Sequence, residues 1–193
     1  MVWLSFLLVA ILSVFWYNAW VYALPTPIPS NYISISNGTK IHLPKGIQID
    51  YNKPVFLHFF NPDCPCSRFN LQQFTSLVKQ YGTNINFVVV PISNKSFTSK
   101  ELQKKTGLSI PVWQDTSLAK SCGVYSTPQA VIINTDSTLY YRGNYNKNRY
   151  CTDKETSYAK MAIENILSNR PNNIMAMSAI TAYGCSLPKC SRK

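Results

Sequence analysis

Hydrophobic and polar positions divide this chain into short apolar runs and segments of helical period. Two continuous apolar runs, 54–60 and 84–91, have the length and β-branched or aromatic content of buried strands. Between them, residues 67–81 repeat apolar side chains at helical spacing, which predicts an amphipathic helix. Two strands joined by a helix are expected to be parallel.

Smaller elements are predicted on either side of this unit. Residues 31–48 alternate around an Asn37-Gly38 turn, which is typical of a β-hairpin. Residues 129–134 and 139–142 are two strands whose short connection requires an antiparallel pair. Helix signals come from capping boxes at Thr98-Ser-Lys-Glu101 and Thr152-Asp-Lys-Glu155, a stop at Gly107, and a cap at Asp115 for a short helix ending at Cys122.

The N-terminal segment is almost wholly apolar, with aromatic residues near its end. Its length suits a transmembrane helix, so residues 1–24 are interpreted as a membrane anchor or a signal. Residues 25–30 form a proline-rich spacer, residues 31–168 one α/β domain, and residues 169–193 a weakly patterned tail that contains cysteine.

Charge and cysteine content narrow the function classes. The net charge is +11, but the basic residues are scattered and no nucleic-acid motif occurs, so the charge indicates a solvated face near anionic lipid rather than nucleic-acid binding. Six cysteines in 193 residues favour an oxidising compartment. We therefore expect the soluble part to face the non-cytoplasmic side of the membrane, which is the periplasm in a bacterium.

Two cysteines stand where the first long strand turns into its helix. A helix N-terminus carries partial positive charge and lowers the pKa of a thiol there, so Cys64 is the candidate nucleophile, with a sulfur expected to be open to solvent. The neighbouring Asp63 opposes the thiolate by like charge, and it either caps the helix or moves a proton.

Three separated motifs resemble the thioredoxin superfamily, in particular its membrane-tethered, peroxiredoxin-like members. They are Phe59-Phe-Asn-Pro-Asp-Cys64, Gly123-Val-Tyr-Ser-Thr-Pro128 and Leu139-Tyr-Tyr-Arg-Gly143. The resemblance implies a three-layer α/β/α sandwich with a mixed sheet. It also implies a cis Pro128 that faces the cysteines and, with Thr127, offers backbone groups to a substrate chain. The family's peroxidases use Thr or Ser where Asn61 stands, which weakens a peroxidase interpretation.

The cysteine spacing departs from the family. Cys64-Pro65-Cys66 replaces the usual Cys-x-x-Cys. Either Cys66 is the resolving thiol, which is the assignment we favour, or Cys64 is resolved by Cys122 or by a tail cysteine. Cys122 is otherwise interpreted as a core residue.

The last three cysteines are candidates for a structural disulfide. Cys185 and Cys190 are expected to pair with each other, or one of them with Cys151, which would fix the tail to the domain. The alternative is that the tail lies over Cys64 and resolves it.

The sequence thus predicts an extracytoplasmic, membrane-tethered thiol–disulfide oxidoreductase that acts on protein thiols through Cys64 and Cys66 without a cofactor. Two other functions stay open. Cys64 and Cys66 together are soft ligands suited to Cu(I), which would make the chain a metallochaperone. A catalytically silent scaffold is the third interpretation.

Overall fold

The computed structural model describes residues 2–148 and 151–187, apart from the side chains of residues 18, 19, 21–23, 65 and 66. Its central feature is a four-stranded mixed sheet in the order β2-β1-β4-β5. Strand β1 (Val55–Phe60) pairs in parallel with β2 (Asn86–Pro91) and antiparallel with β4 (Gln129–Ile133), which pairs antiparallel with β5 (Leu139–Gly143). Both predicted strand relationships are confirmed. The fold is a mixed α/β fold consistent with a thioredoxin-like architecture.

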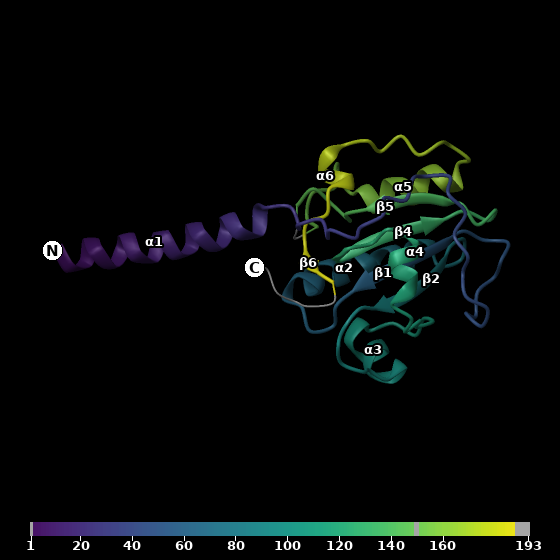
Figure 1. Cartoon of the computed structure of the whole chain (residues 1–193), viewed down its shortest axis with the longest axis horizontal. Helices are drawn as coiled ribbons and strands as arrows, with labels where there is room; N and C mark the ends of the chain where they lie inside the picture. The colour runs from purple at the N-terminus through teal and green to yellow at the C-terminus, as the bar shows by residue number, and fades with distance from the viewer. Residues whose placement is uncertain (1, 149–150, 188–193) are drawn as a thin grey trace.

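The helices other than α1 (Val2–Ala23) lie around this sheet (Figure 1). Helix α2 (Pro65–Tyr81) connects β1 to β2, as the sequence pattern predicts, and begins two residues earlier than expected. The other elements in chain order are α1 (Val2–Ala23), α3 (Ser99–Thr106), α4 (Ser117–Ser121), β3 (Ser126–Thr127), α5 (Tyr158–Leu167), α6 (Met177–Ile180) and β6 (Cys185–Ser186).

Hydrophobic cores lie on both faces of the sheet, because alternate residues of each strand point to opposite sides. On one face, side chains such as Phe56 pack against Phe74 of α2 and Ile163 of α5. On the other face, Leu57 and its neighbours pack against Leu118 of α4 and against the segment 35–49. The central strand β1 is buried along its whole length. The three layers agree with the expected sandwich.

The N-terminal apolar segment forms the single helix α1, which extends away from the rest of the chain (Figure 1). The predicted membrane anchor is not supported, since none of the helices in the described residues has the length and hydropathy that a membrane crossing needs.

Two local predictions are wrong. The predicted hairpin at 31–48 does not form. The backbone N–H groups of Gly38 and Ile41 instead donate to Leu139 and Ser137, so this segment lies along the start of β5. The predicted capping box at Thr152 is also absent, and α5 begins after Ser157.

The other helix signals are confirmed. Thr98 and Glu101 form a reciprocal capping box at α3, and Gly107 ends that helix in the left-handed conformation. The Asp115 carboxylate accepts a hydrogen bond from the Ser117 N–H at the start of α4.

Candidate functional site

Cys64 lies at the corner between β1 and α2. It is the N-cap residue of α2, with extended backbone, and Pro65 follows at the first helical position, where the missing N–H leaves no helical bond unmade. The corner is fixed by local hydrogen bonds: the Cys64 N–H donates to the Asn61 carbonyl, and the Asn61 N–H donates to the Ser67 hydroxyl. The sequence therefore places this sulfur at a helix N-terminus, as the strand and helix patterns predict.

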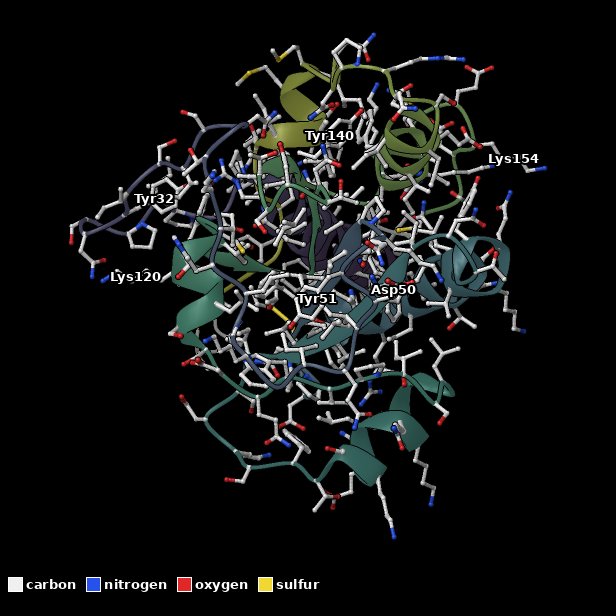
Figure 2. The ribbon with its side chains drawn as sticks, turned by 90° about the vertical axis from the view of Figure 1, so that its right-hand side faces the viewer. Tyr32, Asp50, Tyr51, Lys120, Tyr140 and Lys154 are labelled. Atoms are coloured by element: carbon white, nitrogen blue, oxygen red, sulfur yellow. A yellow bond between two sulfur atoms is a disulfide. The ribbon has the colours of Figure 1, made fainter. Side chains whose placement is uncertain are left out.

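The sulfur of Cys64 is bonded to that of Cys185, 121 residues further along the chain. A yellow bond between two sulfur atoms is visible inside the domain in Figure 2. Both cysteines are buried, at 0% and 4% exposure. The expectation that the sulfur of Cys64 is open to solvent is therefore wrong for this disulfide form, in which it is bonded to a buried tail residue.

This pairing also corrects the expected structural disulfide. Cys185 was expected to bond Cys190 or Cys151, but its sulfur is already used by Cys64. Cys190 and the side chain of Cys66 lie outside the described residues. The resolving role assigned to Cys66 therefore stays a prediction. The disulfide thus follows the alternative in which the tail reaches Cys64.

The tail reaches Cys64 by pairing with the loop before β4. Strand β6 runs antiparallel to β3, with Cys185 opposite Thr127 and Ser186 opposite Ser126. The peptide bond between Thr127 and Pro128 is cis, as the resemblance implies. Cys185, which is bonded to Cys64 and pairs with Thr127, therefore connects the corner at Cys64 with the Thr-Pro loop.

Thr26, which the sequence analysis missed, joins three segments beneath this strand pair. Its buried hydroxyl lies 2.8 Å from the Ser126 hydroxyl, donates to the Gly184 carbonyl at 3.1 Å, and accepts from the Gly184 N–H at 2.9 Å. Its backbone N–H donates to the Ala182 carbonyl. A threonine inside a proline-rich segment gives no pattern that could have revealed this role.

Asp63, which precedes Cys64, is paired with two cations. The Lys95 ammonium lies 3.1 Å from one carboxylate oxygen and that of Lys105 lies 3.7 Å from the other. These pairs are partly exposed and contribute little to stability. They do bring positive charge close to Cys64, which offsets the like-charge effect of Asp63 on a thiolate there.

Two further cysteines with described side chains, Cys122 and Cys151, lie in protected environments. Cys122 is fully buried in the core between α4 and the sheet, as predicted, and burial raises the pKa of its thiol to about 12. Cys151 is partly buried and donates to the Asn70 side-chain oxygen at 2.8 Å; burial raises the pKa of this thiol to about 12 as well. Neither environment favours a reactive thiolate at neutral pH.

A buried histidine lies behind the corner, on β1. The His58 ring stacks on Phe74 and Phe60, and its Nδ1 is hydrogen-bonded to the Tyr145 hydroxyl at 2.6 Å. Burial lowers the pKa of His58 to about 3, so it is neutral near pH 7. Within the described residues, no three His, Cys, Asp or Glu side chains gather as a metal site.

The chain is similar to several solved structures. A hypothetical protein from Sinorhizobium meliloti 1021 is 18% identical, with a TM-score of 0.64 over 81% of this chain and 96% of that chain. An uncharacterised conserved protein from Geobacillus kaustophilus is 18% identical, with a TM-score of 0.66 over 88% of this chain and 100% of that one. The thioredoxin domain of a thiol-disulfide oxidoreductase from Bacteroides vulgatus is 13% identical, with a TM-score of 0.49 over 62% of this chain and 96% of that domain.

No curated protein is significantly similar to this chain in sequence. A family profile does match, over residues 34–187, and it is described as a domain of unknown function (DUF6436). The matched range includes the corner at Cys64, the Thr127-Pro128 loop and the tail cysteine Cys185. The chain therefore belongs to the DUF6436 family.

Proposed function

We propose that this protein is a thiol–disulfide oxidoreductase in which Cys64 is the nucleophile and Cys185 is the resolving cysteine. The observation that carries the proposal is the Cys64–Cys185 disulfide at the N-terminus of α2, beside the cis Thr127-Pro128 bond. A disulfide at a helix N-terminus is chemically asymmetric. In a mixed disulfide between Cys64 and substrate, Cys64 is the better leaving group of the two sulfurs, because the helix stabilises its thiolate.

One turnover can be written with all atoms and electrons accounted for and without a cofactor. A substrate thiolate attacks the sulfur of Cys64, a new S–S bond joins substrate and Cys64, and Cys185 leaves as a thiolate that takes up a proton. A second substrate thiolate then attacks the substrate sulfur of this mixed disulfide and releases Cys64. The substrate is oxidised by two electrons, and the Cys64–Cys185 disulfide is reduced to two thiols. The reverse sequence reduces a substrate disulfide.

The substrate class follows from the surroundings of the nucleophile. The backbone of Thr127 already pairs with a peptide strand, that of β6, at the position next to Cys64. Strand addition at such an edge recognises main chain, and pockets for alternate side chains add specificity. We propose that the substrates are protein thiols and disulfides in extended segments.

Trapping of the mixed disulfide with substrate distinguishes the roles of Cys64 and Cys185. We expect Cys64→Ser to abolish insulin reduction with dithiothreitol as the electron donor, and Cys185→Ser to accumulate a mixed disulfide between Cys64 and substrate, found by mass after acid quenching. Cys122→Ser is the matched control, because it removes a buried thiol from the same domain. Full activity of the Cys64 variant contradicts the proposal.

Cys66→Ser tests the resolving role that the sequence assigned to Cys66. We expect this variant to turn over without accumulating the mixed disulfide. Accumulation in Cys66→Ser, with none in Cys185→Ser, returns the resolving role to Cys66.

We also propose that the domain acts outside the cytoplasm. A disulfide that joins residues 121 positions apart persists in an oxidising compartment and is reduced in the cytoplasm. A fusion to alkaline phosphatase, which is active only after export, tests this location. An inactive but intact fusion contradicts it.

A further inference from the structure

The tail segment Gly184–Leu187 lies as a strand along the Thr-Pro loop. Cys185 and Ser186 pair antiparallel with Thr127 and Ser126, and the Leu187 N–H donates to the Tyr125 carbonyl at 3.3 Å. The segment is thus held by main-chain contacts on both sides of its cysteine. These are the contacts that any other extended peptide would make in the same place.

The position before the cysteine admits only glycine. A Cβ built on Gly184 would lie 2.2 Å from the Thr127 carbonyl oxygen and 2.8 Å from the Ser126 hydroxyl oxygen. The carbonyl belongs to the strand that the tail pairs with, so it cannot move without breaking that pairing. A peptide bound in place of the tail can therefore have only glycine at this position.

The second position after the cysteine has room for a large apolar side chain. Leu187 packs against the core on the α4 face of the sheet and borders a cavity of about 480 Å³. The cavity is also lined by Tyr32, Tyr125, Val124 and Lys120. Figure 2 shows Tyr32 and Lys120 on the same side of the domain. Leucine at this point leaves much of the cavity open to a larger apolar group.

We propose that residues 184–187 imitate the substrate, and that the protein recognises extended segments of the form Gly-Cys-x-apolar. This inference rests on the proposed function and names its substrate class. Because the tail and the substrate use the same strand position on β3, they occupy it in turn. The tail leaves when a substrate strand bonds Cys64. In the reducing direction it returns with Cys185, whose thiolate attacks Cys64 and displaces the substrate as a thiol; in the oxidising direction a second substrate thiolate releases Cys64, and the tail returns afterwards.

The experiment uses the full-length Cys185→Ser variant, so that the tail cannot bond Cys64 again. Four-residue peptides carry thionitrobenzoate on their cysteine, and Cys64 attacks the peptide sulfur. A peptide–Cys64 disulfide forms, and the released thionitrobenzoate is followed by its absorbance. The peptides are Gly-Cys-Ser-Leu, Ala-Cys-Ser-Leu and Gly-Cys-Ser-Asn, all with blocked ends.

We expect the alanine peptide to react about tenfold more slowly, because its methyl group overlaps the Thr127 carbonyl. We expect the asparagine peptide to react about fivefold more slowly, because an uncharged polar side chain of similar size replaces an apolar contact in the cavity, without a charge that Lys120 would attract. The serine tail competes equally with all three peptides, so it does not change the ratios. Reduced wild-type protein gives the same comparison if the variant does not fold, with adducts trapped by acid and counted by mass.

The outcomes distinguish this inference from the proposed function. Equal rates for the three peptides, all dependent on Cys64, overturn the substrate class and leave the oxidoreductase standing. Rates that persist in the Cys64→Ser/Cys185→Ser double variant show reaction at another cysteine and overturn both. A slower alanine peptide with an unaffected asparagine peptide overturns the apolar requirement at the cavity.

Discussion

Gly184→Ala is the substitution whose effect can be worked out most directly. The added methyl group would lie 2.2 Å from the Thr127 carbonyl oxygen, which is well inside contact distance, and 2.8 Å from the Ser126 hydroxyl oxygen. In the disulfide form the tail cannot retreat, because Cys185 is bonded to Cys64 on one side and Thr26 holds Gly184 on the other. With both cysteines reduced, the covalent restraint is gone and the tail can shift.

The steric cost therefore falls mainly on the disulfide form. Overpacking of this kind costs about 1–3 kcal/mol. That range lowers the equilibrium constant for closing the disulfide by about 5- to 160-fold. A two-electron couple changes by about 30 mV for each factor of ten, so we expect the reduction potential of the Cys64–Cys185 pair to rise by about 20–65 mV.

The assay is equilibration of full-length protein in dithiothreitol buffers of graded ratio, followed by acid quenching, alkylation and mass mapping of the pair. Ser186→Ala is the matched control, because it changes the next tail residue and keeps the backbone pairing with Ser126. We expect the control to match the wild type. A Gly184→Ala protein that closes the same disulfide at the wild-type potential would refute the steric argument.

Three further predictions concern the surroundings of the site. Thr26→Val should lower the stability of the disulfide form to urea by about 1–3 kcal/mol, because the buried Gly184 N–H loses its acceptor; an unchanged urea midpoint contradicts the bridging role. His58 has a folded pKa of about 3 against 6.5 for an unfolded histidine, so the unfolded state binds the extra proton between these values. Stability should therefore fall as the pH drops through this window, by about 1.4 kcal/mol per pH unit at most, and His58→Phe should flatten this acid limb in pH-dependent urea unfolding. Burial raises the pKa of Cys122 and of Cys151 to about 12, so iodoacetamide near neutral pH should leave both unmodified in the folded, reduced protein while it alkylates Cys64; a mass map with either buried thiol modified first contradicts this order.

Local patterns were sufficient to predict most of the sheet and the strand-to-helix corner at Cys64. Continuous apolar runs predict buried strands wherever both faces are covered, and β1 and β2 are covered on both sides. The helical period after Cys64 predicts α2, and together they place the cysteine at the N-cap. The sequence indicated that the Thr-Pro loop faces this corner only through the family resemblance, because the two motifs lie in separate segments of the chain.

Only the tertiary structure decided which sulfur meets Cys64. The tail has no helical or strand period to predict its path, and its partner is 121 residues away in the sequence. The strand position of Cys185 depends on backbone groups of Thr127, on the hydroxyl of Thr26 and on the missing side chain of Gly184. Other contacts between distant segments replaced the predicted hairpin at 31–48 with pairing to β5. Sequence periodicity reports which face of an element is buried, whereas disulfide partners and strand edges depend on which buried faces meet in space.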